Sequence, residues 1–270
     1  MHQPIGCALL MLLCMSVASG HNLQRDQDMA AALWEQAVAA KGGRERLAAI
    51  QSFAIHQRRD FGRLTLRDMA TRRVRQIVCV LPEAWWEFVD YRPGKLGYSV
   101  LTANVQTGRG WSTLGGPAQP LLRGYGDLAY RMRQLQYVYF LETRAVRPSP
   151  IRASRVRHGF ASVDRVETRI DDDLVVFELD VKTHLPIRIE TSRKNTVPPP
   201  RPGMTRPGDS RYVYELDRYA DVSGIQVPGR VKLGGDASEV RVEINPDYEP
   251  SIFTTPPSPD ATMEAWRKKN

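Results

Sequence analysis

The feature that most constrains this fold is an alternation of apolar and polar residues with a period of two, which starts at Ser52 and recurs as far as Ile244. Alternating residues place apolar side chains on one face of a β-strand and polar side chains on the other. Glycine, proline and aspartate turn signals separate the short runs. Helical segments do not alternate regularly with them, so the sequence predicts an antiparallel sheet. The expected strands are 52–61, 63–69, 72–80, 84–91, 96–103, 160–170, 174–180, 185–191, 211–219, 224–233 and 238–244.

A helix is expected near the N-terminus, over residues 29–41. Four apolar residues fall on one stripe of a helix with 3.6 residues per turn, with Trp34 and Val38 beside it: Met29, Leu33, Ala37 and Ala40. Asp26 or Asp28 is the expected N-cap, and the glycine pair at 42–43 ends the helix. A second, short helical turn follows in "RERLAAI".

Another helix is expected in the middle of the chain, from Asp127 to about Leu141. Four residues recur there at i, i+4, i+7 and i+11, which is the spacing of one helix face: Leu128, Met132, Leu135 and Tyr139.

One motif is written twice, as "FELDVKTHLPIRIE" at 177–190 and "YELDRYADVSGIQVPGRV" at 214–231. Each copy predicts a hairpin with one apolar and one charged face, and the prolines are expected at the first residues of their strands. The charged faces should carry Glu–Arg pairs across the strands, with Arg188 and Arg230 outside the apolar face. The motif therefore indicates architecture and not catalysis. The apolar face should hold Phe177, Leu179, Ile187, Tyr214, Leu216 and Val231.

The first twenty residues contain no Asp, Glu, Lys or Arg. The apolar run Ile5–Val17 is too short to span a bilayer, and small residues follow it, with cleavage expected after Ala18 or Gly20. Residues 1–20 are therefore expected to be a signal peptide, and the protein to be periplasmic. After cleavage Cys79 alone remains, so no intramolecular disulfide can form; its context "QIVCVLP" predicts a small buried residue in a strand.

The charge balance is basic, with 38 Lys and Arg against 30 Asp and Glu and a formal net charge of +8. This favours an anionic partner, although a codon-biased genome with solvated arginines would give the same composition. The basic clusters are spread over alternating strand faces of an exported protein, which argues against nucleic acid. We expect transient contact with an anionic membrane surface or a membrane-bound partner.

Motifs for chemistry are absent from the sequence. The five histidines include no HExxH pair, and there is no G-x-S-x-G nucleophile elbow and no phosphate-binding loop. The acidic run 171–173 lacks the spacing of a calcium loop and is interpreted as a hairpin turn. We expect no catalytic residue, no metal site and no cofactor. The alternative of a hydrolase assembled from distant Asp, His and Ser residues stays open.

The aromatic residues exceed what one small core requires, although each one alone would fit ordinary core packing. A continuous apolar face of the sheet could line a cavity for an acyl chain. The candidate cavity-lining residues, chosen from the pattern, are Trp85, Trp86, Phe88, Trp111, Leu135 and Tyr139.

The order of motifs resembles a known superfamily. It comprises a helix that ends in Gly-Gly ("AVAAKGGRERLAAIQSF"), "GRGW", a mid-chain helix, "FELDVKTHLPIRIE", "DVSGIQVPGRVKL" and "VRVEINPDYEPSIFTTPP". This order, over most of residues 27–257, is similar to the LolA-like periplasmic lipoprotein-carrier superfamily, that is, to outer membrane lipoprotein-sorting proteins. No residue here matches the gating arginine of true lipoprotein carriers.

The resemblance implies an α+β fold. A large curved antiparallel β-sheet, an incomplete barrel, would carry the N-terminal helix and the mid-chain helix packed on its concave face. Residues 21–257 would form a single domain, with a Pro-rich loop insertion at 194–210 and a basic tail at 258–270.

The resemblance also implies an exported, non-enzymatic carrier or chaperone. Its cargo would be an acyl chain, lipid or lipoprotein held in a hydrophobic cavity, and the protein would be a monomer. The alternative is an envelope regulatory or protein-interaction module on the same fold.

Overall fold

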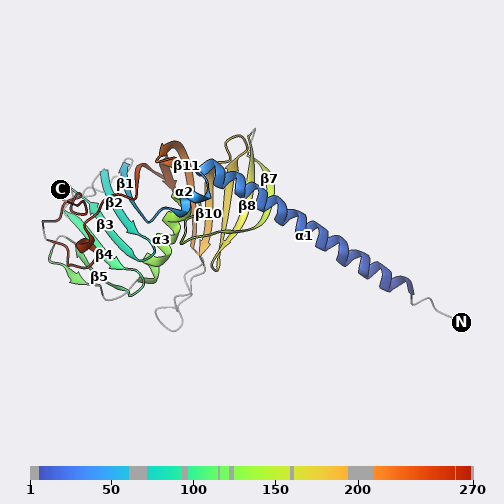
Figure 1. Cartoon of the computed structure of the whole chain (residues 1–270), viewed down its shortest axis with the longest axis horizontal. Helices are drawn as coiled ribbons and strands as arrows, with labels where there is room; N and C mark the ends of the chain where they lie inside the picture. Colours follow the sequence, from blue (N-terminus) through green and yellow to red (C-terminus); the bar gives the residue numbers. More distant parts are fainter. Residues whose placement is uncertain are drawn as a thin grey trace. The chain divides into compact units, whose positions relative to one another are not determined.

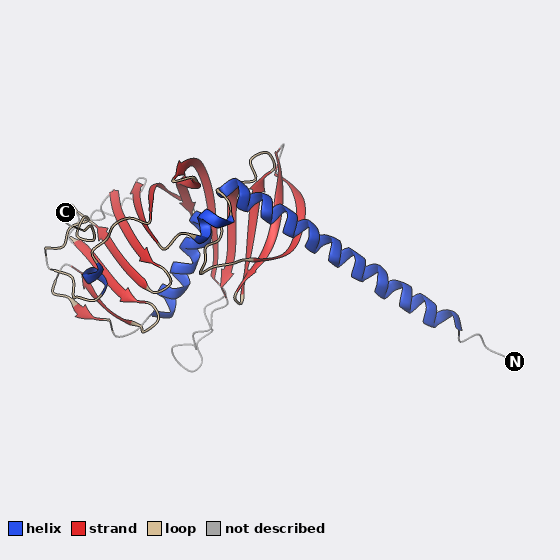
Figure 2. Cartoon of the chain, viewed as in Figure 1, coloured by secondary structure: helices blue, strands red, loops and turns tan. Residues whose placement is uncertain are grey.

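The computed structural model describes residues 6–60, 72–92, 97–114, 116–121, 125–158, 161–193, 210–258 and 260–268. Within these ranges, thirteen strands form one antiparallel sheet in the order β6-β5-β4-β3-β2-β1-β13-β12-β11-β10-β9-β8-β7 (Figure 1). The sheet is not closed, because β6 and β7 are its edges. The predicted fold class, a large antiparallel sheet with an N-terminal and a mid-chain helix, is confirmed (Figure 2).

The bounds of the elements are as follows. The helices are α1 (Gly6–Lys41), α2 (Arg44–Ala48), α3 (Tyr125–Phe140) and the 3₁₀ helix η1 (Pro250–Phe253). The strands are β1 (Ser52–Asp60), β2 (Arg72–Val80), β3 (Ala84–Asp90), β4 (Tyr98–Asn104), β5 (Arg109–Leu114), β6 (Gln119–Pro120), β7 (Ser149–His158), β8 (Ala161–Ile170), β9 (Asp173–Asp180), β10 (Pro186–Arg193), β11 (Ser210–Val222), β12 (Ile225–Leu233) and β13 (Asp236–Ile244).

The sequence predicted some of these bounds and missed others. The mid-chain helix is confirmed, and so is the end of the first helix at Lys41. The N-cap prediction is wrong, because α1 begins before Asp26 and Asp28, which lie inside it. The strand expected at 63–69 and most of the 194–210 insertion lie outside the described residues.

Strands β5, β6 and β7 were not predicted. Gly110 interrupts the pattern of β5, but a Cβ at this position would lie 2.1 Å from the carbonyl oxygen of Thr102 on β4, so the close approach of the two strands requires glycine. Strand β7 contains Pro150 and several arginines, so its sequence was interpreted as a basic cluster and not as a strand. Both features are tolerated in β7 because it is an edge strand.

The chain divides into two compact units, of which the first comprises Met1–Ala37 and Pro148–Arg211. Its core lies where α1 packs on β9, with the rings of Trp34 and Phe177 in edge-to-face contact at 5.0 Å between centroids. The β9–β10 hairpin is the first copy of the doubled motif. Phe177 and Ile189 pair in register on the buried face, while Glu178 lies opposite Arg188 on the other face, as predicted.

The turn of this hairpin is built by Asp180. Its side chain accepts hydrogen bonds from the backbone N–H groups of Lys182 and Thr183, at 3.0 and 2.8 Å, and these bonds hold the pKa of the Asp180 carboxyl below its ordinary value. The acidic run 171–173 is likewise a turn, between β8 and β9, as expected.

The second unit comprises Val38–Arg147 and Tyr212–Asn270. Its β11–β12 hairpin is the second copy of the motif, with Leu216 opposite Val231 and Asp217 opposite Arg230. The prediction for the proline is wrong in this copy, because Pro228 lies within β12 and not at its start. Pro228 pairs with Tyr219 of β11, next to Arg218, whose positive φ of 56° marks a local distortion of that strand.

Strands β1 to β3 of the second unit are buried on both faces. The register places Phe53, Cys79 and Trp85 side by side, whereas Ala54, Val78 and Trp86 lie side by side on the opposite face. We call the first the α3 face, since Phe140 of α3 contacts Phe53 at 5.1 Å between ring centroids. The predicted buried, unpaired Cys79 is confirmed.

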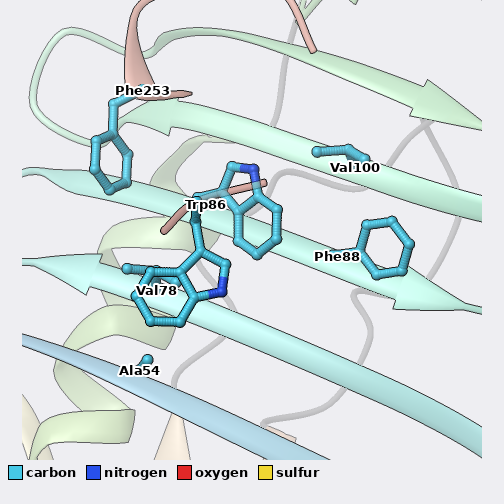
Figure 3. Packing of buried hydrophobic residues seen from close by; sticks show 7 residues of the cluster. Ala54, Val78, Trp86, Phe88, Val100 and Phe253 are labelled. Atoms are coloured by element: carbon cyan, nitrogen blue, oxygen red, sulfur yellow. The ribbon is translucent and has the colours of Figure 1, made fainter. Parts of the chain in front are cut away.

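The opposite face, which we call the strap face, is covered by the C-terminal strap, residues 245–258 and 260–268. Figure 3 shows Phe253 of the strap in one cluster with Trp86, Phe88, Val78, Val100 and Ala54. Trp266, in the segment expected to be a basic tail, is fully buried in this same cluster.

Candidate functional site

The α3 face is a wide apolar surface that the C-terminal end of α3 contacts at β1. Its apolar side chains are almost inaccessible to solvent and come from four neighbouring strands: Phe53, Ile55, Ile77, Cys79, Trp85 and Val242. Helix α3 contacts it through Tyr139, a residue of the predicted stripe, and through Phe140. Leu128, Met132 and Tyr139 of that stripe are buried, and Leu135 is half-buried.

The C-terminal end of α3 is held by directed bonds. The hydroxyl of Tyr139 accepts a hydrogen bond from Nε2 of Gln57 on β1 at 2.9 Å, and burial raises the pKa of Tyr139 to about 12. The backbone carbonyl of the same residue accepts a hydrogen bond from Nζ of Lys41 at 2.6 Å. One tyrosine therefore ties α3 both to the sheet and to the end of α1.

Lys41 is fully buried at the C-terminus of α1. Its Nζ donates to the carbonyl oxygens of Tyr139 and Gln226, and it lies 5.0 Å from the ring centroid of Tyr219. Burial lowers the pKa of Lys41 to about 7. A neutral amine has two N–H donors, which match the two carbonyl acceptors.

The glycines after Lys41 allow this arrangement. Gly42 has a φ of +124°, and a Cβ on it would lie 2.3 Å from the carbonyl oxygen of Gly224 in the β11–β12 turn. Arg46 in turn lies against Gly224, about where a Cβ on that glycine would point. The "KGGRER" and "DVSGIQVP" motifs therefore meet in space, and their glycines are required for backbone contact.

A partly buried ion pair also lies on the α3 face. Nε of Arg75 on β2 lies 2.7 Å from Oε1 of Glu87 on β3. Nearby, Nε1 of Trp85 is buried and finds no hydrogen-bond acceptor within the described part of the chain. The face is thus apolar over most of its area, with a few polar groups that could orient a ligand.

The six candidate cavity-lining residues do not lie on one face. Trp85 and Tyr139 lie at the α3 face, and Leu135 is on α3 itself. Trp86, Phe88 and Trp111 share the strap face, because the register aligns Trp86, Thr102 and Trp111 across β3, β4 and β5. Pattern alone grouped these aromatic residues, although adjacent residues of a strand point in opposite directions.

Two polar residues of the α3 face, Gln57 and Arg75, were missed, and so was Lys41, which bonds to α3. Gln57 and Arg75 are polar members of a face that is otherwise apolar, so alternation assigned them no role. A signal for Lys41 did exist, because a lysine in the last turn of a helix directly before Gly-Gly is placed where the helix dipole favours a cation.

The histidines provide no metal site in the described residues, where no group of three His, Cys, Asp or Glu side chains is placed to hold an ion. His56 lies on the strap face, with Nε2 at 2.9 Å from Oε1 of Glu243. His184 is in the β9–β10 turn, and the side chain of His158 is outside the described residues. Among the described helices, none is both long and apolar enough to cross a membrane.

Comparisons with known proteins give structural matches only. No protein-family model matches the sequence, and a search of the curated proteins finds no match. Among solved structures, the chain is similar to an outer membrane lipoprotein-sorting protein domain from Vibrio parahaemolyticus, with 11% sequence identity and a TM-score of 0.42; the match covers 82% of this chain and 97% of that chain.

A second structural match is a LolA superfamily protein from Nitrosomonas europaea. The sequence identity is 14% and the TM-score is 0.46, with 84% of this chain and 97% of that chain covered.

Proposed function

We propose that this protein is an exported, non-enzymatic carrier that holds the acyl chain of a lipid or lipoprotein between α3 and strands β1 to β3. The observation that carries the proposal is the α3 face, an apolar surface of several strands that α3 contacts at Phe53 and Gln57. Displacing this helix would uncover an area of the kind that binds a hydrocarbon chain.

An acyl chain would compete with α3 for this face. Burial of an acyl chain gains roughly 0.8 kcal/mol per CH₂ group, so a chain of about 16 carbons gains on the order of 12 kcal/mol before entropic costs. Ligand entry would have to offset the loss of the contact between Phe140 and Phe53 and of the hydrogen bond between Tyr139 and Gln57. Helix α3 can therefore act as a lid that the ligand replaces.

Polar groups on the same face would receive the end of the ligand that is not hydrocarbon. The indole N–H of Trp85 is a buried donor with no acceptor in the described residues, and it is suited to a carbonyl or ester oxygen. Delivery to a membrane agrees with the basic net charge of the chain. Periplasmic location follows from the expected signal peptide at residues 1–20 and is part of the proposal.

Adjacent tryptophans provide the test. Trp85 lies on the α3 face and Trp86 on the strap face, and both are buried, so alanine at either position should destabilise the fold to a similar degree. We expect Trp85→Ala to weaken binding of a fluorescent fatty acid at least about tenfold and Trp86→Ala to leave it near the wild-type value. Organic extraction of the purified wild-type protein should also recover lipid.

The proposal fails if the wild-type protein neither takes up the fatty acid nor yields co-purifying lipid. Equal losses in the two variants would place the ligand elsewhere or reflect stability alone. Recovery of a stoichiometric protein partner without lipid would favour the alternative of an envelope regulatory or protein-interaction module.

A further inference from the structure

The strap face is a second apolar surface, which the proposed carrier function does not use. It is covered neither by a strand nor by a long helix but by the C-terminal strap, a segment with one short 3₁₀ helix. Phe253 and Trp266 are the buried anchors of the strap, and Tyr248, Ile252 and Met263 are partly buried against the same cluster. The segment thus covers apolar surface with little regular structure of its own.

The two ends of the strap are fastened by polar contacts. At its start, Oδ1 of Asn245 accepts hydrogen bonds from the backbone N–H groups of Gln51 and Ser52, at 2.8 and 3.0 Å. Near its end, the backbone N–H of Glu249 donates to the carbonyl of Trp266 at 2.8 Å, which closes the strap into a loop. The loop is attached to the sheet through the residue that follows, Arg267.

Arg267 is attached at one crowded carboxylate, that of Glu243 on β13. Oε1 of Glu243 accepts bonds from Nη2 of Arg267 at 2.8 Å and from Nη2 of Arg241 at 2.9 Å, and it lies 2.9 Å from Nε2 of His56. The guanidinium of Arg267 also bonds to Glu264 and stacks 4.3 Å from the ring centroid of Trp266. Three basic side chains therefore share one carboxylate oxygen.

The covered face also contains buried polar atoms that the strap does not satisfy. Both side-chain polar atoms of Gln76, which lies beside His56 in register, are buried without a partner among the described residues, and so is Nε1 of Trp266. Unsatisfied buried donors and acceptors raise the free energy of the covered state relative to one in which water reaches them. The closed state of the strap is therefore less stable than its apolar contacts alone would make it.

We propose that the C-terminal strap is a releasable cover of the strap face, and that protonation of His56 opens it. The charged groups around His56 are Glu243 and Arg241 of β13 and Arg267 of the strap; Gln76 on β2 is neutral. With His56 neutral, the positive charges of Arg241 and Arg267 balance the negative charges of Glu243 and Glu264. A proton on His56 adds a third cation beside a carboxylate that is already shared by two.

The direction of the pH effect follows from the surroundings. Burial is the largest influence on His56 and lowers its pKa, Glu243 opposes that shift, and Arg241 and Arg267 add to it. Release of the strap removes Arg267 and admits water, so His56 binds its proton more tightly when the strap is open. Acid therefore shifts the equilibrium toward the open state, with the change starting below the ordinary histidine value of about 6.5.

Hydrogen exchange measured by mass spectrometry on the full chain tests this proposal. Between about pH 7.5 and 5.0, after correction for the intrinsic rate, exchange in peptides from the strap should accelerate severalfold, because His56 binds its proton more tightly in the open state. Peptides from β2 report on the core and should not change. His56→Gln, which keeps a side-chain N–H donor but does not ionise in this range, should abolish the acceleration.

A second variant tests whether the strap is held through the carboxylate that His56 shares with the two arginines. Glu243→Gln removes the shared carboxylate, so the strap should exchange rapidly already at about pH 7.5, with β2 still protected. The proposal is overturned if strap exchange in the wild-type protein shows no acceleration at low pH, if His56→Gln accelerates as the wild type does, or if β2 loses protection together with the strap.

Discussion

The pH dependence of stability should reveal the buried amine of Lys41. Its pKa is lowered to about 7 by burial, from an ordinary value of 10.5 that the unfolded chain should retain. Between these two values the unfolded chain binds a proton that the folded chain does not, so this group makes the folded state more stable as the pH rises. Below about pH 7 both states are protonated, and the cost of the buried charge is fully present.

The magnitude follows from the shift. Each pH unit between the two pKa values adds at most about 1.4 kcal/mol to the free energy of unfolding. From about pH 7.5 to 9.0 the gain for this group is about 2 kcal/mol, because folded Lys41 still carries part of a proton at the lower pH. Lys41→Met removes the titration and leaves the carbonyls of Tyr139 and Gln226 without this donor.

Other groups act in the opposite direction and must be separated. Burial raises the pKa of Cys79 well above its ordinary value of 9.0 and that of Tyr139 to about 12, so both lower the stability when the pH passes the values of the unfolded chain. The wild type and Lys41→Met share these groups. The difference between their pH profiles therefore isolates Lys41.

Urea unfolding of both proteins at about pH 7.5 and 9.0 is the assay. We expect the wild-type free energy of unfolding to rise relative to that of Lys41→Met by about 2 kcal/mol over this interval. Lys232→Met, a lysine on the exposed side of β12, controls for the change of side chain and net charge. Parallel pH profiles for the wild type and Lys41→Met would refute the reasoning, since they would mean that the amine titrates alike in both states.

Two further substitutions, each with a control, test the packing of the two units separately. Gly42→Ala should lower the free energy of unfolding by more than about 2 kcal/mol, because it combines a φ of +124° with a Cβ 2.3 Å from a carbonyl oxygen; Gly43→Ala, with a φ of +89° and open space around it, should cost about 1 kcal/mol. Thermal unfolding distinguishes the two, and equal losses would contradict the backbone contact. Trp34→Ala should cost about 3 to 5 kcal/mol by removing the contact with the β9 aromatic ring, whereas Met29→Ala, exposed on the same helix, should change the stability by less than about 0.5 kcal/mol; a small loss for the tryptophan variant would contradict the assigned core.

The features that the sequence predicted correctly depend on local information. The hairpin of residues 177–190 follows from alternation, a turn and a proline at a strand start, all within fourteen residues. The mid-chain helix follows from one stripe of Leu128, Met132, Leu135 and Tyr139. In both cases neighbours in sequence are neighbours in space, so a period is sufficient to identify the element.

The features that the sequence did not reveal depend on contacts between distant segments. Gly110 looked like a turn residue, because the close approach of Thr102 that requires it comes from another strand. The meeting of Gly42 with Gly224 and the bond between Lys41 and Tyr139 join segments that are far apart in the chain. No spacing rule within one segment can predict such pairs.

The division of the candidate site between two faces could, however, have been inferred from strand β3 alone. In "AWWEFVD" the two tryptophans are adjacent, so they must point to opposite faces of the sheet, and Phe88 must share the face of Trp86. A sheet that is open to water on one side would expose one of two neighbouring indoles, at a cost of about 2 kcal/mol or more in unburied apolar surface. Adjacent large aromatic residues in a strand therefore require a cover on each side. Here α3 lies on the side of Trp85 and the C-terminal strap on the side of Trp86. The need for both covers follows from the seven residues of β3.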